Sequence, residues 1–346
     1  MKKFLIKISY TLLPVWLFFV VFAIYLWVSN DNTGDLMRLA LIKSDPGYVD
    51  SIRSALLPDV YYKQLNSDSL LRQDTCDVLV FGDSFSHGGG VGKWGDYVNY
   101  LAHDGNLKVT VFSYQDNPVQ MAYDALNLGI IDSTRVRNLV VEEIERYIDS
   151  RHSVFVTTDT CIVQNTTLQV AAKADDDKPP KESYSPLLRV KDYIFYHCFG
   201  ANPIYDARLS IPAFGGMSPD LLYFYNEDVK LGVNLSSGQR NRIVSNYKRL
   251  ITLARERGVN LILLIACDKY DLYQDWIVDN PYPAKTLNED ISQWMTPDER
   301  QHFIFAKEVL HPLVEQGVKD VYLFNDTHWS PASSRIIAGE VIKKLD

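Results

Sequence analysis

The sequence predicts an α/β protein with a parallel sheet covered by helices on both faces, preceded by one transmembrane helix. Three observations support this fold class. Short apolar runs rich in β-branched residues recur along the chain, amphipathic helical patterns alternate with them, and a long uncharged run opens the sequence. Strands that alternate with helices are typical of a parallel sheet, and such apolar runs suit strands buried on both faces.

The opening run covers residues 8–28 and contains no Asp, Glu, Lys or Arg. It is long enough for a helix that crosses a bilayer, which needs about 20 apolar residues. Three lysines precede the run and Asp31 follows it, which predicts a cytoplasmic amino end and an extracytoplasmic remainder. The alternative is a cleaved signal peptide, but residues 27–32 contain no small-x-small cleavage site. We expect a single-pass anchor in the cell inner membrane, with the rest of the chain in the periplasm.

Strands and helices are expected at regular intervals after a proline-containing stretch. The clearest helix covers residues 236–258, where apolar positions form one stripe and Gly258 ends the pattern. Helical spacing also predicts helices over residues 120–128 and 331–345. The five apolar runs that predict strands are residues 77–81, 108–114, 136–141, 260–266 and 319–324.

These elements predict the domain organisation. We expect a cytoplasmic tip and transmembrane anchor over residues 1–29, a stalk or linker over 30–75 and one catalytic domain over 76–346. The segment from about residue 151 to 227 interrupts the alternation of strands and helices. It contains a polar, proline-bearing loop at residues 175–180. This segment is predicted to be an insertion in the domain.

Composition and motifs exclude several classes of partner and cofactor. A net charge of -8 and an isoelectric point near 5.4 argue against nucleic-acid binding, which needs a basic face. There is no C-x-x-C motif, and the histidines fit no ligand spacing, so we expect no metal. Residues 90–95 match G-x-G-x-x-G, but the pattern begins too far past the preceding strand for a dinucleotide fingerprint. No cofactor is expected. Cys76 and Cys267 are predicted core residues, whereas Cys161 and Cys198 could form a disulfide.

A serine follows the first apolar run at the position where open α/β sheets hold their ligands. Gly82, Asp83 and Ser84 come directly after the strand-like run that ends at Phe81. A serine hydroxyl is a weak nucleophile that needs an adjacent base and an exposed turn. Gly-Asp-Ser is also an ordinary turn sequence, so it does not by itself identify a catalytic serine.

A second polar string follows the last apolar run. Asn325, Asp326, Thr327 and His328 come directly after Phe324. An aspartate two positions before a histidine can orient its ring and stabilise the imidazolium. A surface-loop histidine is the simpler alternative. If the two strings meet in space, they supply Ser84 as nucleophile, His328 as base and Asp326 as the carboxylate that orients it.

The pair of strings resembles the SGNH/GDSL hydrolase superfamily. Within it, Asp-Thr-His-Trp resembles the alginate-type polysaccharide O-acetyltransferases, and residues 140–146 and 268–273 are also similar. The resemblance implies a flavodoxin-like three-layer sandwich with Ser84, His328 and Asp326 as the catalytic triad. It covers roughly residues 77–345, discontinuously. The chain departs from the commoner superfamily pattern by carrying Asn325 three positions before the histidine.

The superfamily's Gly-x-Asn-Asp oxyanion block is absent, so the oxyanion donors must be sought elsewhere. Candidates are backbone N–H groups of Ser84 and of the glycines from Gly88 to Gly90, and the Asn117 side chain. Four residues near the strand ends are candidate substrate contacts: His87, Lys269, Tyr270 and Trp329. The charged residues 142–146 are expected to be a surface cluster, or alternatively a Glu142–Arg146 pair that braces the site.

The sequence therefore predicts a membrane-anchored periplasmic serine O-acetyltransferase that acts on an envelope or exported polysaccharide through an acyl-enzyme. Because the periplasm lacks acetyl-CoA, the resemblance also implies a partner of the membrane-bound O-acyltransferase class that delivers the acetyl group. Two alternatives remain open. One is an esterase with water as acceptor. The other is a non-catalytic glycan-binding or scaffold subunit.

Overall fold

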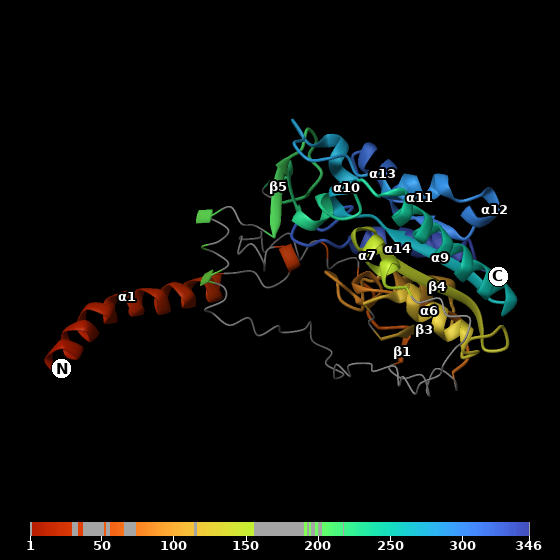
Figure 1. The fold of residues 1–346 in the computed structure, drawn as a ribbon, viewed down its shortest axis with the longest axis horizontal. Helices are drawn as coiled ribbons and strands as arrows, with labels where there is room; N and C mark the ends of the chain where they lie inside the picture. Colours follow the sequence, from red (N-terminus) through yellow and green to blue (C-terminus); the bar gives the residue numbers. More distant parts are fainter. Residues whose placement is uncertain are drawn as a thin grey trace.

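The chain forms an α/β domain with a separate amino-terminal helix, as the computed structural model shows in Figure 1. The structure describes residues 2–29, 34–36, 52, 56–65, 74–113, 116–155, 190–191, 194, 198–199, 203–216 and 218–345.

The core of the domain is a six-stranded, fully parallel sheet with the order β1-β3-β2-β4-β7-β8. The five strands from β2 onward follow the flavodoxin-like order 2-1-3-4-5, and β1 adds an edge strand. The chain places β3 on one side of β2 and β4 on the other, so the order of strands switches between β2 and β4. Such folds bind their ligands at this switch point. The predicted α/β fold is therefore confirmed. The strands are β1 (Lys63–Leu65), β2 (Cys76–Phe81), β3 (Val109–Phe112), β4 (Val136–Ile144), β7 (Asn260–Ala266) and β8 (Phe303–Phe305).

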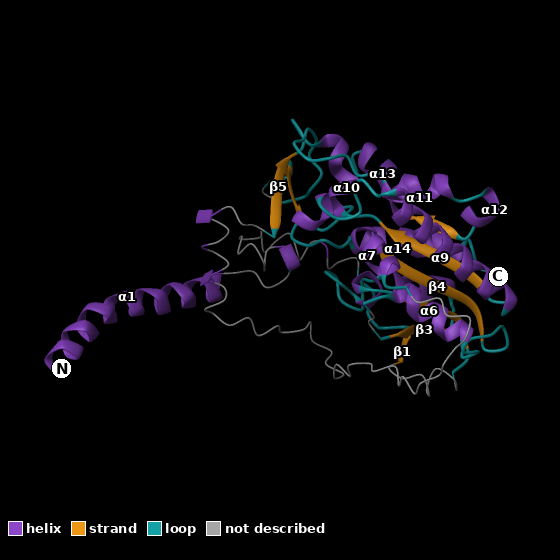
Figure 2. Cartoon of the chain, in the orientation of Figure 1, coloured by secondary structure: helices purple, strands orange, loops and turns teal. Residues whose placement is uncertain are grey.

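Helices cover both faces of this sheet and make the three layers visible in Figure 2. Alternate side chains of β2 enter different apolar clusters, with Val78 and Val80 in one and Leu79 and Phe81 in the other. The first cluster packs against α5 (Tyr97–Gly105), α13 (Ala306–Glu315) and α14 (Pro331–Ile342). The second packs against α6 (Pro118–Asn127), α9 (Ser237–Glu256) and α11 (Leu287–Trp294).

The helix ends follow local sequence signals. Ser236 and Gln239 form a capping box that starts α9, and Gly258 adopts the left-handed conformation (φ +67°) just past its end. Asn117 caps α6 by accepting from the Gln120 backbone N–H, with Pro118 at the first helical position. The three helices predicted from spacing are all present. The remaining short helices are α7 (Ile148–Ser153), α10 (Lys269–Tyr273) and α12 (Pro297–Arg300).

One predicted strand is wrong. Residues 319–324 form no strand; Tyr322 makes only an isolated antiparallel bridge to Trp329, which turns the chain back on itself. The run is apolar because Val321 and Tyr322 are buried in the loop's packing against the core. The edge position of the sheet is taken by β8, three residues long and immediately before α13.

Two segments outside the predicted core contribute structure. β1 lies within the segment predicted as a stalk, so the sheet begins before residue 76. The predicted insertion contains an antiparallel pair, β5 (Ile204–Arg208) and β6 (Leu221–Tyr225). The loop at residues 175–180 and Cys161 lie outside the described residues. Cys76 and Cys267 are buried, as predicted.

The amino-terminal helix α1 (Lys2–Ser29) extends away from the domain in Figure 1. Among the described residues it is the one helix long and apolar enough to cross a membrane, over Lys7–Tyr25, and most of its side chains in that stretch are exposed. Length and composition of this kind fit either a membrane anchor or a signal sequence.

Candidate active site

Ser84 lies just past the carboxyl end of β2, as the first residue of a single 3-10 turn, Ser84–His87. The Asp83 carboxylate caps this turn by accepting from the Phe85 backbone N–H at 3.3 Å. The Ser84 side chain is only half-buried. The strand and the capped turn therefore present its hydroxyl at the ligand-binding edge of the sheet.

Gly82 is required by the close approach of the turn to β4. A Cβ atom on Gly82 would lie 2.0 Å from Ser86 Oγ and 2.7 Å from Glu142 Oε2. That same Glu142 oxygen accepts from the Asp83 backbone N–H and from the Ser86 hydroxyl, each at 2.9 Å. A larger residue at position 82 would push the turn that carries Ser84 away from the strand.

Asp83 is a structural carboxylate in this turn. Its Oδ2 atom accepts from both terminal nitrogens of Arg151 at 3.0 Å and from the Ile144 backbone N–H at 3.1 Å. Burial alone would raise the pKa of Asp83, but the Arg151 guanidinium and these bonds hold it below its ordinary value. The ionised side chain thus links the serine turn to α7 and to the end of β4.

The structure brings Ser84, His328 and Asp326 together. His328 Nε2 lies 2.7 Å from Ser84 Oγ, and His328 Nδ1 lies 2.5 Å from Asp326 Oδ1. With Nδ1 donating to the carboxylate, Nε2 is left as an acceptor for the serine proton. This arrangement can activate a serine hydroxyl for attack on a carbonyl.

The electrostatics of the buried His–Asp pair favour the charged forms. Burial opposes the imidazolium, but the adjacent Asp326 carboxylate raises the pKa of His328 above its ordinary value. Burial likewise opposes the ionised Asp326, and His328 together with its hydrogen bond lowers the pKa of that carboxyl. The pair is therefore suited to holding a proton on the ring during a reaction.

The glycine-rich segment after Ser84 packs directly on the His–Asp pair. A Cβ on Gly89 would lie 2.3 Å from His328 Nε2, and one on Gly90 would lie 2.9 Å from Asp326 Oδ1. Gly90 also has a positive φ of 74°, which side chains disfavour. The glycines thus serve close approach to the histidine.

The sequence predicts Lys269 as a substrate contact near the strand ends. In the structure, Lys269 is buried beneath the loop that carries His328. Its ammonium donates to the backbone carbonyls of Leu323 at 2.7 Å, Phe324 at 2.9 Å and Asp326 at 3.1 Å. Burial lowers the pKa of Lys269 to about 7. These bonds from Lys269 stabilise a loop where the sequence predicts a strand over residues 319–324.

The other three predicted substrate contacts, His87, Tyr270 and Trp329, each have structural partners, and their contact with a substrate stays a prediction. Burial lowers the pKa of His87 to about 4, and backbone groups of the sheet hydrogen-bond its ring. The Tyr270 hydroxyl donates to the Pro283 carbonyl at 2.9 Å within the core. Trp329 is fully buried, with its ring centroid 4.4 Å from that of Phe85.

Three of the predicted oxyanion donors have other partners. The Gly88 backbone N–H donates to the Ser84 carbonyl as the cap of the serine turn. The Gly89 N–H donates to the same carbonyl at 2.8 Å. The Asn117 side-chain amide donates to the Arg151 carbonyl at 3.0 Å. Of the donors predicted, the Ser84 N–H and the Gly90 N–H stay as predictions.

The predicted Glu142–Arg146 alternatives are both wrong. The two residues are buried, not on the surface, and each forms hydrogen bonds with other residues. Glu142 supports the serine turn as described above. Arg146 donates to Asp228 at 3.2 Å and to Asp268 at 2.7 Å, and its guanidinium lies 5.2 Å from the centre of the Tyr225 ring.

Sequence reasoning missed Asp35, whose carboxylate lies beside the His–Asp pair. Asp35 Oδ2 is 4.0 Å from His328 Nδ1, and the Asp35 backbone N–H donates to Asp326 Oδ2 at 3.0 Å. The residue comes from the segment predicted as a stalk, 291 positions away from Asp326. No pattern of spacing marks it, because its role depends on a contact distant in sequence.

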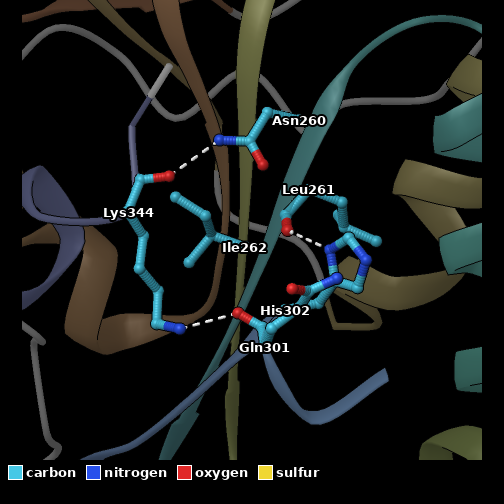
Figure 3. A pocket seen from close by; sticks show the side chains of 6 residues that line it. All are labelled: Asn260, Leu261, Ile262, Gln301, His302 and Lys344. Atoms are coloured by element: carbon cyan, nitrogen blue, oxygen red, sulfur yellow. Dashed lines mark hydrogen bonds between the residues drawn. The ribbon is translucent and has the colours of Figure 1, made fainter. Parts of the chain in front are cut away.

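A separate cavity lies at the other end of the strands from Ser84, where β7 begins (Figure 3). Its polar groups bond to one another across the cavity, as in the Asn260 amide to the Lys344 carbonyl at 2.8 Å and the Lys344 ammonium to the Gln301 carbonyl at 2.6 Å. None of the predicted site residues line it. The lining residues are Asn260, Leu261, Ile262, Gln301, His302 and Lys344.

Comparison with known proteins gives one family match. Residues 223–346 match the family model described as the SGNH hydrolase-like domain of acetyltransferase AlgX. The matched range contains Asp326 and His328, whereas Ser84 lies before it. No curated protein and no solved structure matches this chain. The SGNH resemblance predicted from the two polar strings is thus confirmed, and residues 223–346 are similar to the SGNH hydrolase-like domain of the acetyltransferase AlgX.

Proposed function

We propose that this chain is a membrane-anchored serine O-acetyltransferase that acts outside the cytoplasm on an envelope or exported polysaccharide. The observation that carries the proposal is the hydrogen-bonded series from Ser84 Oγ to His328 Nε2 and from His328 Nδ1 to Asp326. The similarity of residues 223–346 to an acetyltransferase domain supports acetyl transfer as the reaction class.

In the first half of the reaction, Ser84 Oγ attacks the carbonyl carbon of an acetyl donor. His328 Nε2 takes the serine proton as the bond forms, and Asp326 stabilises the imidazolium. The tetrahedral intermediate then collapses, and His328 returns the proton to the leaving group. The product of this half is acetyl-Ser84.

In the second half, a sugar hydroxyl attacks the carbonyl of acetyl-Ser84. His328 removes the hydroxyl proton, the new ester bond forms, and the Ser84 oxygen leaves with that proton. Atoms balance without a cofactor, because one ester is exchanged for another. Water in place of the sugar hydroxyl would give free acetate, the outcome of the esterase alternative.

The proposed location follows from α1 and from the charge pattern around it. A helix with exposed apolar side chains over Lys7–Tyr25, preceded by lysines, fits a single-pass anchor in the inner membrane with the domain in the periplasm. In that compartment the acetyl donor must arrive from the membrane. A membrane-bound O-acyltransferase partner is the donor we propose, together with a polysaccharide acceptor.

The test uses the full-length chain in detergent with p-nitrophenyl acetate as donor. Ser84→Ala and His328→Ala should each lower kcat/KM by about 10⁴-fold, because the nucleophile and base act as a unit. Ser86→Ala is the matched control for a serine of the same turn, and should lower it far less. Wild-type activity in Ser84→Ala would refute the nucleophile assignment.

The acceptor is then tested by mass spectrometry with polysaccharide oligomers present. Acetylated oligomer that accumulates faster than free acetate supports the transferase. Free acetate alone supports the esterase. A folded wild-type protein that neither hydrolyses the ester nor reacts with a fluorophosphonate probe at Ser84 would favour the non-catalytic glycan-binding subunit.

A further inference from the structure

A three-residue segment soon after α1 contacts the loop that carries the proposed base. Asp35 Oδ1 accepts from the Thr327 backbone N–H at 2.9 Å, and Oδ2 accepts from the Thr327 hydroxyl at 2.5 Å. In return, the Asp35 backbone N–H donates to Asp326 Oδ2 at 3.0 Å. One residue thus bonds both the carboxylate that orients His328 and the residue between the two.

Three hydrogen-bond donors surround the Asp35 carboxylate. A third donor, the Tyr225 hydroxyl, reaches Oδ2 at 3.2 Å, so every bond to this carboxylate comes from a donor. Burial and the neighbouring Asp326 raise the pKa of Asp35 above its ordinary value, and His328 and the two Thr327 bonds offset this only in part. Two carboxylates therefore flank one imidazole, Asp326 at 2.5 Å and Asp35 at 4.0 Å from Nδ1.

The residues on either side of Asp35 hold the segment in place. A Cβ atom on Gly34 would lie 2.0 Å from the Asn325 carbonyl oxygen, so the backbone can approach the loop this closely only with glycine. Leu36 is fully buried in a small cluster with Ile204 and partly buried Tyr223, Tyr225 and Phe324. The close approach of Gly34, the burial of Leu36 and the hydrogen bonds of Asp35 all hold this segment against the loop that carries His328.

We propose that Asp35 is a positioning residue that fixes the Asp326–His328 loop, so that the site is complete only when the segment following α1 is docked on it. The inference rests on the proposed function, since it assigns Asp35 to the same Ser84–His328–Asp326 site. Asp35 acts through Thr327 and Asp326 and does not touch Ser84. Its charge acts on the His328 ring, which also faces Asp326 and lies within the field of Arg146.

Two isosteric variants of the full-length chain separate the charge of Asp35 from its hydrogen bonds. Asp35→Asn removes the charge, so the His328 pKa should fall and the acidic limb of the kcat/KM profile should move to lower pH. Thr327→Val removes one hydrogen bond and keeps the charge, so kcat should fall with the limb unmoved. Each variant should lose about 10- to 100-fold in kcat with little change in KM for p-nitrophenyl acetate, as expected for a displaced base.

The matched control is Asp220→Asn. It removes the charge of an exposed carboxylate that pairs with Arg208 at the β5–β6 hairpin, the hairpin that also carries Tyr225. It should leave kcat and the pH profile as in the wild type. Thermal unfolding of each variant checks that the domain remains folded. A folded Asp35→Asn protein with reduced kcat and the shifted limb supports the positioning role.

The two failures are distinguishable. Wild-type kcat and an unmoved limb in Asp35→Asn, with Ser84→Ala inactive, would overturn the role of Asp35 and leave the proposed function standing. Reduced kcat with an unmoved limb in Asp35→Asn would show structural damage and also overturn it. Full activity in Ser84→Ala would overturn the proposed function, and the role of Asp35 with it.

Discussion

His328 Nε2 and Ser84 Oγ lie 2.7 Å apart although 244 positions separate them in the chain. The contact is made because β2 delivers the serine turn to the carboxyl edge of the sheet and the loop before α14 folds back over that edge. Buried charged residues support both partners. Asp83 and Arg151 support the turn that carries Ser84, and Asp326 supports His328. These supports are the parts of the site that substitution can test.

Asp326→Asn should lower kcat/KM by about 10⁴-fold, because an amide can favour the wrong tautomer of the His328 ring. The Asp326 carboxylate raises the pKa of His328, so its removal should also move the acidic limb of the pH profile to lower pH. Initial rates with p-nitrophenyl acetate between pH 5 and 9 measure both effects. A loss below tenfold would contradict the role of Asp326.

Gly89→Ala should reduce activity by about 100-fold with the fold intact, because the new Cβ would lie 2.3 Å from His328 Nε2 and must displace the ring. Gly339→Ala is the matched control. Gly339 lies inside α14 with no atom within 4 Å of an added Cβ, so alanine there should keep activity and raise helix stability by up to about 1 kcal/mol. Equal activities of the two variants would contradict the packing of Gly89 on the histidine.

Lys269→Met should destabilise the domain and flatten part of its pH dependence. The folded-state pKa of Lys269 is about 7, below its ordinary value, so the unfolded chain binds the extra proton as pH falls from about 10 to 7. The free energy of unfolding attributable to this lysine therefore rises with pH across that window. Urea denaturation of both proteins at pH 7 and 9 measures it, and identical pH slopes would show that Lys269 is not perturbed.

Arg151→Met should cost about 3–5 kcal/mol of unfolding free energy, because it leaves the buried Asp83 carboxylate without its partner. Arg208→Met breaks the exposed pair with Asp220 and should cost at most about 1 kcal/mol. Chemical denaturation of the two variants compares a buried ion pair with an exposed one. Similar losses would mean that Arg151 is not a structural support of the serine turn.

The parts of the fold that could be predicted are those set by local periodicity. Four of the five predicted strands and all three predicted helices form, because buried strands need apolar runs and helices such as α9 need an apolar stripe and caps. The fifth run, residues 319–324, is apolar because it packs as a buried loop against Trp329. A buried loop and a buried strand both need apolar residues. The apolar pattern alone therefore could not tell this loop from a strand.

The site was predictable where function forces residue types together in sequence, as in Gly82–Ser84 and Asp326–His328. It was not predictable where charged side chains are buried by distant partners. Lys269 has the sequence context of an exposed rim residue, yet three carbonyls of the His328 loop bind it in the interior. Asp35 carries no local signal at all, since all its partners lie far along the chain.

The bond between Asp35 and Thr327 also limits where the chemistry can take place. Asp35 follows Ser29, the last residue of α1, by six positions, and an extended chain covers at most about 3.3–3.6 Å per residue. The Asp35 backbone therefore lies within about 22 Å of the end of the helix. If α1 spans a bilayer, Ser84 works in the shallow layer next to the lipid headgroups. Under the proposed function, an acetyl group from a membrane-embedded donor would then have little water to cross, and the polysaccharide would have to come to the membrane to be modified.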